Sequence, residues 1–359
     1  MSERGPAPGP RSFPLIQALR GIAALGVLLF HAREGGHIPA LVSALPDRLD
    51  LILFRSGHYG VPIFFALSGF VIAHSLRDVT LSGRFLGRFI LRRSIRLDPP
   101  YWGAIVIVIL FGWLSARVHH EPFVPPSVAQ VAAHVVYLQG ILGQPGLNPA
   151  FWTLTYEVQF YLFFVSLLVL AARLVRMGVP AAMPIAWVVM TALALVAAAQ
   201  SLPTMPDGLF VTLWPDFFVG VLAYWAVFRR DARIALALLI VPLMLVGPWQ
   251  EDAFFGRASA LTALVLLATT RTGYADRGLD WRWLQFLGAI SYSLYLLHNS
   301  LTGAAGMLAH RAAGSGLAAD LIVLAAILVA SIGGAALYWW VVERTAHRLS
   351  RKVALRRAP

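Results

Sequence analysis

Two residues that could take part in acid–base chemistry lie in the first apolar stretch of the sequence. Arg20 and His31 belong to the segment LIQALRGIAALGVLLFH, residues 15–31. In a helix, this spacing amounts to about 16 Å and about three turns, so both side chains would lie on one face. Such groups on a membrane helix are costly unless they face a partner or a water-filled cavity, which favours a functional site. The alternatives are that Arg20 reaches the headgroups and that His31 lies at the interface.

A second candidate site is basic. Arg93 and Arg96 lie in the segment RFLGRFILRRSIRLDPPYW, residues 84–102, and share a helix face at i, i+3 spacing. The guanidinium fork of arginine can donate two hydrogen bonds to a phosphate at once. Contact with anionic lipid explains Arg84 and Arg88 well but explains Arg93 and Arg96 less well. A phosphate-bearing ligand and lipid anchoring therefore both remain open for Arg93 and Arg96.

A carboxylate lies within another apolar stretch. Glu157 occurs in FWTLTYEVQFYLFF, residues 151–164, and the expected topology places it in the outer half of its span. A carboxylate in lipid surroundings must be paired, protonated or functional. A glutamate close to a histidine can orient the ring and stabilise the imidazolium, as in general-base catalysis. We therefore expect Glu157 to orient His31.

Other polar residues could line a cavity. A semi-polar stripe in FLGAISYSLYLLHNS, residues 286–300, consists of Ser291, Tyr292, Tyr295 and His298. His298 is either a substrate contact or a hydrogen-bonded structural histidine, and we favour the structural role. Ser68 is a further candidate lining residue, although Ser68-Gly69 is better explained as a site of close helix packing. Glu343 is most simply explained as an interfacial ion pair with Arg344.

The composition identifies an integral membrane protein. Of the 359 residues, 58% are hydrophobic and only 13% are charged, and the mean hydropathy is +0.71. A soluble domain has about a quarter of its residues charged. The absence of cysteine excludes disulfides, thiolate metal sites and cysteine nucleophiles, and His119-His120 lacks the spacing of a metal site. The net charge of +12 does not indicate nucleic-acid binding, because the basic residues lie in alternate loops.

The apolar segments predict an all-α, polytopic helix bundle of about ten transmembrane spans with both termini cytoplasmic. Arginine is concentrated in the loops that this topology places inside, as the positive-inside rule requires, and an odd number of spans would break the pattern. We expect a disordered cytoplasmic tail over 1–14, a transmembrane domain over 15–343 and a basic cytoplasmic tail over 344–359. Residues 128–142 would form a short interfacial or re-entrant helix. The predicted spans are 15–32, 58–76, 100–117, 153–173, 182–200, 209–227, 234–248, 257–270, 284–308 and 319–342.

Five of these motifs together resemble a known family. Arg20-x10-His31, FFALSGFVI, RRSIR, WTLTYEVQFYL and ISYSLYLLH occur in the order found in the acyltransferase 3 family of integral membrane O-acyltransferases. The resemblance extends over roughly residues 15–343. Each motif alone is weakly specific, but five in order are specific. The chain looks like a member without an appended esterase-like domain.

The resemblance implies transfer of an acyl group, commonly acetyl, from cytoplasmic acyl-CoA to a hydroxyl of a glycan, a glycolipid or a small molecule. By this resemblance His31 is the catalytic base or an acyl relay, with Arg20 below it. Arg93 and Arg96 would hold the CoA phosphates, and Glu157 matches the acidic position after the tryptophan. No metal is implied, and the bacterial cytoplasmic (inner) membrane is the expected location.

Two departures from the family pattern bear on the site residues, whereas Thr153 and Thr155, where the family often has serine, hardly matter. Thr345 stands where the family often has proline after Glu-Arg, which weakens any role for Glu343. Asp98 close to the arginines would temper a phosphate site. Two other functions remain open: a multi-span transporter or exporter, since intramembrane polar groups also mark transport paths, and a lipid-binding sensor or scaffold. Dependence on acyl-CoA would distinguish the acyltransferase from both.

Overall fold

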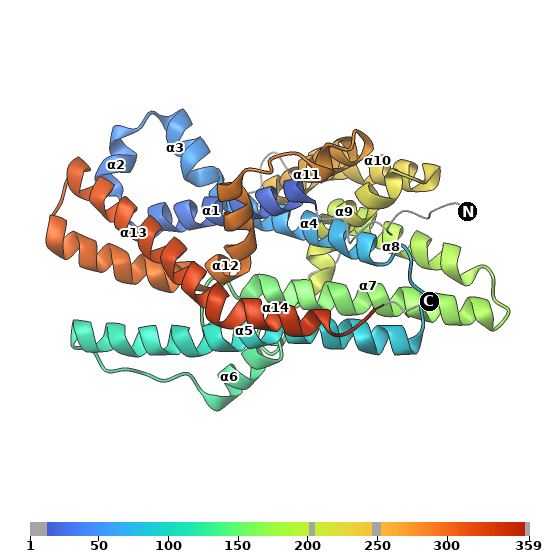
Figure 1. The fold of residues 1–359 in the computed structure, drawn as a ribbon, viewed down its shortest axis with the longest axis horizontal. Coiled ribbons are helices and arrows are strands. Elements are labelled where there is room, and N and C mark those ends of the chain that lie inside the picture. The colour runs from blue at the N-terminus through green and yellow to red at the C-terminus, as the bar shows by residue number, and fades with distance from the viewer. Residues whose placement is uncertain (1–12, 201–204, 246–252, 356–359) are drawn as a thin grey trace, which may run out of the picture.

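The structure, a computed structural model, describes residues 13–200, 205–245 and 253–355. Every regular element in these ranges is helical (Figure 1). The longer helices are α1 (Pro14–Glu34), α4 (Gly60–Ser75), α5 (Gly83–His119), α7 (Trp152–Arg176), α8 (Ala182–Ala198), α9 (Trp214–Ala226), α10 (Arg230–Leu245), α11 (Ala253–Arg271), α12 (Arg282–Ala313) and α13 (Leu317–Tyr338). The shorter ones are α2 (Pro39–Ala44), α3 (Asp47–Leu53), η1 (Arg55–Tyr59), α6 (Val128–Val135), η2 (Phe210–Leu213), η3 (Tyr274–Asp276), the π-helical turn η4 (Trp339–Glu343) and α14 (Arg344–Arg351).

The ten longer helices coincide, in order, with the ten predicted spans. Among the described residues, five helical stretches are long and apolar enough to cross a membrane: 14–34, 47–75, 83–119, 152–176 and 317–351. These stretches and the composition support an all-α membrane protein. The described part of α1 begins, and α14 ends, toward the same end of the bundle (Figure 1). Ten crossings and cytoplasmic termini remain predictions, and most of the predicted N-terminal tail, residues 1–12, lies outside the described residues.

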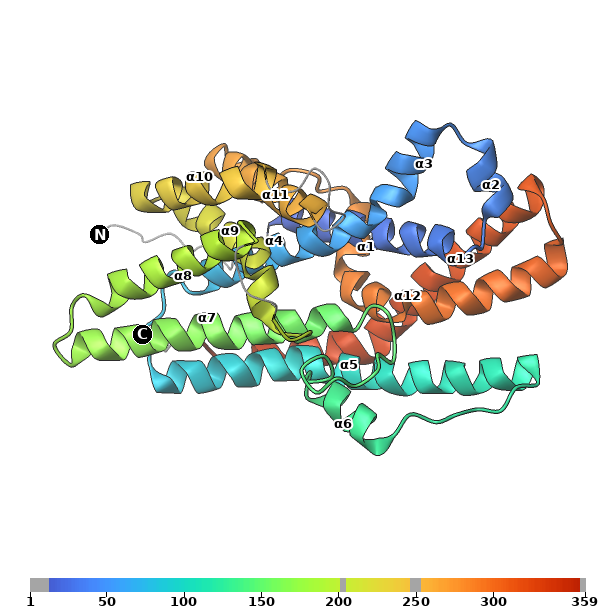
Figure 2. The same ribbon diagram turned by 180° about the vertical axis from the view of Figure 1, so that it is seen from behind.

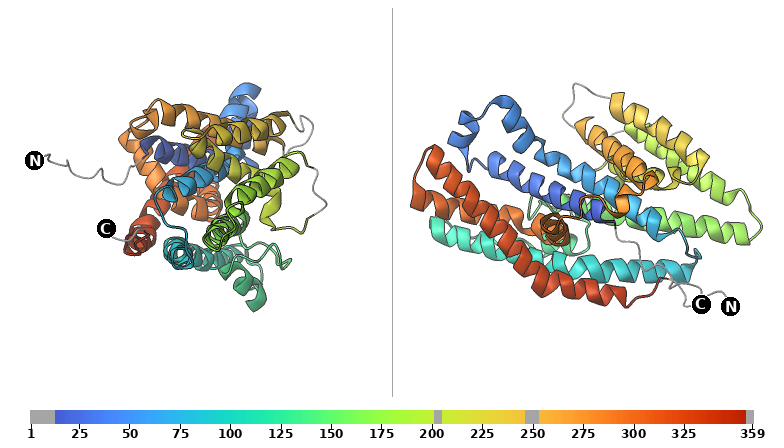
Figure 3. Two further views of the ribbon diagram at one scale, coloured as in Figure 1. Left: turned by 90° about the vertical axis from the view of Figure 1, so that its right-hand side faces the viewer. Right: turned by 45° about the horizontal axis from the view of Figure 1, so that its top comes forward.

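The centre of the bundle is formed by α1, which packs against α4 and α12, while α4 in turn packs against α9 and α11. Figure 2 shows α5 and α7 running along the face opposite α10 and α11, and Figure 3 shows the same layers from the end and at an angle. Each of α1, α4, α5, α7 and α12 therefore presents one face to the interior between these layers. All the charged candidate residues named above, except Glu343, lie on these five helices.

Glycines allow the closest helix contacts. A Cβ on Gly69 of α4 would overlap the carbonyl oxygen of Phe217 in α9, and a Cβ on Gly220 of α9 would overlap that of Ala66 in α4. The predicted packing role of Ser68-Gly69 is therefore confirmed for Gly69. Close contact of this kind lets backbones approach to van der Waals distance, as is typical of small residues between membrane helices.

Helix α5 continues through Pro99 and Pro100, although the sequence analysis placed the start of a span at residue 100. Prolines inside a helix remove backbone donors and leave carbonyl oxygens without helical partners. Two tyrosine side chains bind neighbouring carbonyls of this region: the Tyr292 hydroxyl donates to the Leu97 carbonyl at 3.0 Å, and the Tyr338 hydroxyl donates to the Pro100 carbonyl at 2.6 Å. These bonds fix α5 against α12 and α13 just beyond Arg93 and Arg96.

The loop that follows α6 also reaches α5. The Tyr137 hydroxyl donates to Asp98 at 2.9 Å, and the ring of Tyr137 stacks on Tyr101 with centroids 4.7 Å apart. His134 of α6 is fully buried, and its two ring nitrogens bond the Gln130 carbonyl at 2.8 Å and the Leu147 amide at 3.1 Å. The predicted short helix within residues 128–142 is therefore confirmed as α6, and its following loop folds back into the bundle.

Candidate active site

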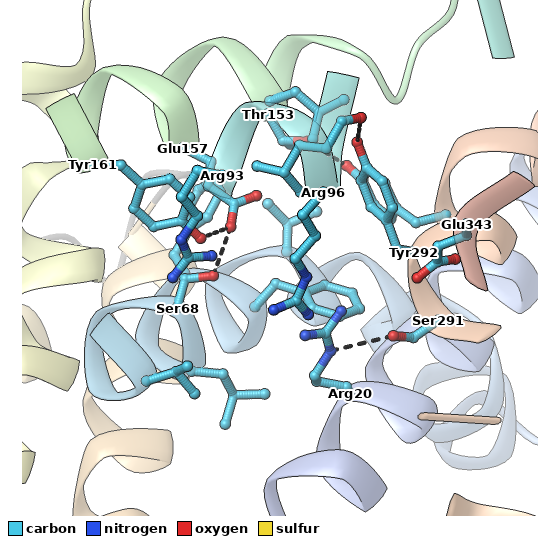
Figure 4. A pocket seen from close by; sticks show the side chains of 18 residues that line it. Arg20, Ser68, Arg93, Arg96, Thr153, Glu157, Tyr161, Ser291, Tyr292 and Glu343 are labelled. Carbon is cyan, nitrogen blue, oxygen red and sulfur yellow. Dashed lines mark hydrogen bonds between the residues drawn. The ribbon is translucent and has the colours of Figure 1, made fainter. Parts of the chain in front are cut away.

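An inner cavity of about 90 Å³ lies among α1, α4, α5, α7, α12 and η4 (Figure 4). We call it the inner cavity because the topology predicted from the sequence places it nearer the cytoplasm. Its charged and hydroxyl-bearing lining residues are Arg20, Ser68, Arg93, Arg96, Thr153, Glu157, Tyr161, Ser291, Tyr292, Tyr295 and Glu343. Most of the predicted site residues therefore meet in one place, although they come from five helices far apart in the sequence.

The three arginines of the inner cavity have no carboxylate oxygen within 4.0 Å in the part of the chain that the structure describes. Arg20 Nε donates to Ser291 Oγ at 3.2 Å, and the Arg93 guanidinium lies 4.3 Å from the ring centroid of Tyr161. Figure 4 shows the guanidinium groups of Arg20 and Arg96 close to each other. Among the described residues, none of the three arginines has an ion pair within 4.0 Å. Unpaired guanidinium groups in a half-buried site are costly, and an anionic ligand would remove that cost.

The two carboxylates of the cavity are held by neutral donors. Glu157 accepts a hydrogen bond from Ser68 Oγ at 2.8 Å and another from the Tyr161 hydroxyl. Glu343 accepts from Ser293 Oγ at 2.5 Å and from the Ser293 backbone amide at 3.1 Å. Neither carboxylate therefore occupies the guanidinium donors, which remain available to a ligand.

A second, outer cavity of about 460 Å³ contains His31. Its polar lining residues are His31, Glu34, His37, His58, Trp152, Tyr295, Asn299 and Thr302, with Phe30, Val61 and Phe255 among the apolar ones. Burial and, secondarily, the neighbouring His310 lower the pKa of His37, so this loop histidine is neutral at neutral pH. Aromatic rings together with hydrogen-bonding groups suit a polar organic molecule.

The partner of His31 is Glu34. His31 Nδ1 lies 2.9 Å from Glu34 Oε2, one helical turn further along α1. This bond places the ring proton on Nδ1 when the ring is neutral and leaves Nε2 free to accept a proton. A neutral imidazole with one nitrogen held by a carboxylate is the arrangement that a general base requires.

Comparison with known proteins identifies the family. A family model described as an acyltransferase domain, acyltransferase 3, matches residues 14–340. The chain belongs to the acyltransferase 3 family. The acyltransferase MdmB of Streptomyces mycarofaciens is 27% identical, with 96% of this chain and 95% of that protein aligned. A protein of Acidianus two-tailed virus, named as an acetyltransferase, is 25% identical over 82% of this chain and 86% of its own.

A third relative is longer than this chain. A Staphylococcus aureus (strain COL) protein, named as an O-acetyltransferase, is 25% identical over 80% of this chain but only 50% of its own length. No solved structure matches the chain. The resemblance drawn from the five motifs is therefore confirmed at the level of the family.

The structure of this acyltransferase 3 chain corrects two expectations. The expectation that Glu157 orients His31 is wrong, because Glu34 holds the His31 ring while Glu157 lines the inner cavity and binds Ser68 and Tyr161. The interfacial ion pair of Glu343 with Arg344 is also wrong. The π-helical turn directs Glu343 into the inner cavity, and Arg344 instead lies 5.7 Å from the ring centroid of Trp339.

The structural role favoured for His298 is supported by one hydrogen bond, whereas its role as a substrate contact stays a prediction, because His298 is not among the lining residues of either cavity. Its Nδ1 donates to the Tyr295 carbonyl at 2.8 Å, as expected of a structural histidine. Its Nε2 is buried and has no hydrogen-bond partner among the described residues, and its ring centroid lies 5.0 Å from that of His31. Thr302, one helical turn further on, lines the outer cavity, and its buried hydroxyl also has no hydrogen-bond partner in the described ranges. Residue type and spacing placed His298 on the correct helix face but could not show its proximity to His31.

Sequence reasoning missed Glu34, His37 and His58 of the outer cavity. Glu34 could have been found, because it lies at i+3 from His31 in the same helix. His58 could not, because the η1 turn that carries it has no sequence signature. In that turn His58 Nδ1 donates to the Arg55 carbonyl at 2.6 Å. Within the described ranges no three histidine, aspartate or glutamate side chains form a group that could hold a metal ion.

Proposed function

We propose that this protein is a membrane-embedded O-acyltransferase that moves an acyl group, acetyl in the first instance, from cytoplasmic acyl-CoA to a hydroxyl. The observation that supports this most strongly is the pair of neighbouring cavities. One contains three arginines that have no ion-pair partner among the described residues, and the other contains a histidine held by a carboxylate. The name of the staphylococcal relative supports acetyl as the acyl group and oxygen as the accepting atom.

In this mechanism Arg93 and Arg96 bind the phosphates of CoA, since each guanidinium can donate two parallel hydrogen bonds. Arg20 adds positive charge next to them and is oriented by Ser291. The thioester then extends toward His31. Nε2 of His31 takes the proton of the acceptor hydroxyl while the hydroxyl oxygen attacks the thioester carbonyl carbon. The carbon–sulfur bond breaks, and the CoA thiolate leaves and takes up a proton.

Glu34 orients the His31 ring and stabilises the imidazolium that forms. A route through an acyl-histidine intermediate uses the same residues, with Nε2 itself attacking the thioester before the acceptor oxygen attacks the acyl group. The acceptor class that we propose is a glycan, a lipid-linked glycan or a hydroxyl-bearing small molecule, and the proposed location is the bacterial cytoplasmic membrane. The lipid bilayer is the expected surrounding, and no nucleic-acid partner is proposed.

Calorimetric titration of the detergent-purified protein with acetyl-CoA tests the donor site. We expect wild type to bind, and the double variant Arg93→Ala/Arg96→Ala to lose at least a hundredfold in affinity. Charge-assisted hydrogen bonds contribute about 1.5–3 kcal/mol each, and 2.7 kcal/mol is already a hundredfold. The matched control is Arg84→Ala/Arg88→Ala, which removes the same charge from exposed positions of α5.

Equal losses in both double variants would mean that the affinity depends on overall charge rather than on the cavity. If wild type binds neither acetyl-CoA nor a longer acyl-CoA, the acyltransferase proposal fails for this donor. The transporter alternative would then be tested directly by substrate flux in proteoliposomes.

A further inference from the structure

The inner and outer cavities share two lining residues. Val61 of α4 and Tyr295 of α12 line both, and every other lining residue belongs to only one of the two cavities. Both are buried, with 9% and 8% of their surface exposed. The boundary between the two cavities is therefore formed by one aliphatic and one aromatic residue from opposite helices.

Contacts on either side hold Tyr295 in place. Its hydroxyl is 2.9 Å from Thr153 Oγ1, and its ring packs edge-on against Phe64 with centroids 5.8 Å apart. Val61 lies in the first turn of α4, directly after Gly60, whose missing Cβ lets α4 approach Ala23 and Val27 of α1. The helices on both sides are thus closely packed, and the width of the boundary is determined by the two side chains rather than by a loop.

The proposed reaction requires a connection at this boundary. The arginines that would hold the phosphates line the inner cavity only, and His31 lines the outer cavity only. A donor anchored on the arginines can deliver its carbonyl carbon to His31 only by extending from one cavity into the other. The residues common to both cavities mark the place where the two spaces come closest.

We infer that Val61 and Tyr295 form the constriction through which the acyl end of the donor reaches His31, and that their bulk limits the size of the acyl group transferred. This inference rests on the proposed function. A short acyl group needs little displacement of the two side chains, whereas each further methylene must displace more of the packed wall. One methylene in an apolar pocket typically changes discrimination between substrates by 10–200-fold. Val61→Ala should therefore improve the use of butyryl-CoA relative to acetyl-CoA at least tenfold.

The absence of cysteine from the chain allows a direct test of the route without knowledge of the acceptor. Bromoacetyl-CoA carries an electrophilic carbon at the end of an acetyl-sized group. A thiolate attacks this carbon, a carbon–sulfur bond forms, bromide and the thiol proton leave, and the protein gains the mass of acetyl-CoA less two hydrogens. Single thiols are placed in the outer cavity with His31→Cys and in the inner cavity with Ser68→Cys, and labelling is measured by intact mass.

We expect bromoacetyl-CoA to label both thiols. Adding Val61→Trp should reduce labelling of His31→Cys at least tenfold and leave labelling of Ser68→Cys within twofold. Val61→Thr, which keeps the shape of valine, should change the labelling of neither His31→Cys nor Ser68→Cys. Iodoacetamide is small and needs no donor site. It should still modify the thiol in the double variant His31→Cys/Val61→Trp, which would show that this thiol remains reactive. If Val61→Trp does not yield folded protein, Val61→Leu provides the smaller obstruction.

The possible results separate the constriction from the donor site. Labelling of His31→Cys that is unaffected by Val61→Trp, or by Arg93→Ala/Arg96→Ala, would mean that the reagent arrives by another route and would overturn the inference. Labelling of Ser68→Cys without labelling of His31→Cys would overturn the inference and leave the donor site standing. Failure to label either thiol, together with no binding of acetyl-CoA, would overturn the donor site and the constriction with it.

Discussion

Replacing Glu34 with glutamine should slow the chemical step of the proposed reaction without weakening acyl-CoA binding. Glutamine keeps an oxygen that can accept the hydrogen bond from His31 Nδ1, so the ring orientation is largely retained. It removes the negative charge that stabilises the imidazolium once His31 has taken the acceptor proton. The loss should therefore be seen in kcat rather than in donor affinity.

The size of the effect follows from the exposure of this pair. The side chain of Glu34 is 58% exposed and that of His31 is 20% exposed, so solvent screens their attraction. Ion pairs of this kind contribute about 0.2–1 kcal/mol. Since 1.36 kcal/mol corresponds to a tenfold change in rate, Glu34→Gln should lower kcat at most about fivefold. Loss of the base itself, in His31→Ala, should lower kcat by about 10²–10⁴.

The assay follows release of the CoA thiol with a thiol reagent, in the presence of an acceptor that wild type acylates. The protein contributes no background because it contains no cysteine. Glu157→Gln is the matched control, because it makes the same chemical change in the inner cavity and should alter acetyl-CoA affinity more than kcat. The reasoning is refuted if Glu157→Gln lowers kcat at unchanged acetyl-CoA affinity while Glu34→Gln behaves as wild type.

Three further predictions concern charge, pH and packing. Glu343→Gln should tighten acetyl-CoA binding at least twofold by calorimetry, because it removes a negative charge that faces Arg20 and Arg96. Burial lowers the pKa of His134, so the unfolded chain binds more protons near pH 6. The contribution of His134 to the free energy of unfolding should therefore be fully present above about pH 6.5 and be lost as the pH falls. A melting temperature that does not change between pH 7.5 and pH 5 would contradict this. Gly220→Ala should destabilise the protein by about 1–3 kcal/mol through overlap with α4, whereas Gly333→Ala, with open space around it, should stabilise it by about 0.5–1 kcal/mol in thermal unfolding.

Helical periodicity correctly predicted which residues line one cavity only for pairs that are close together on the same helix. Arg93 and Arg96 share a face of α5 at i, i+3, and both line the inner cavity as the sequence indicated. The arginine and histidine of α1 lie on one face, but they line different cavities, and side chains of other helices, Val61 of α4 and Tyr295 of α12, form the boundary between the two cavities. Spacing along one helix does not show which side chains of neighbouring helices pack against it. The division of the site into two cavities could therefore not be predicted from the sequence.

Contacts between helices account for the remaining differences. Glu157 and His31 were both expected in the outer half of their spans, but depth alone does not determine a partner, and a glutamate one turn away on the same helix holds the His31 ring. Glu343 was misassigned because the π-helical turn changes the direction of its side chain, and no residue pattern announces such a turn. Helix α5 runs through Pro99 and Pro100 although the predicted span began at residue 100, and in this region tyrosine hydroxyls from α12 and α13 bind the carbonyls of Leu97 and Pro100.

The distribution of charge bears on the alternative of a transporter. The inner cavity holds three arginines and two glutamates, and the glutamates accept hydrogen bonds from hydroxyl groups and a backbone amide rather than from the arginines. Unpaired guanidinium groups oppose the passage of a cation, so a cation path through this cavity is disfavoured on electrostatic grounds. An anion would be attracted, but transport of the whole anion would require its phosphates to leave the arginines and pass the wall formed by Val61 and Tyr295. An acyltransferase needs only the uncharged acyl end to pass, which is the smaller demand on a closely packed boundary.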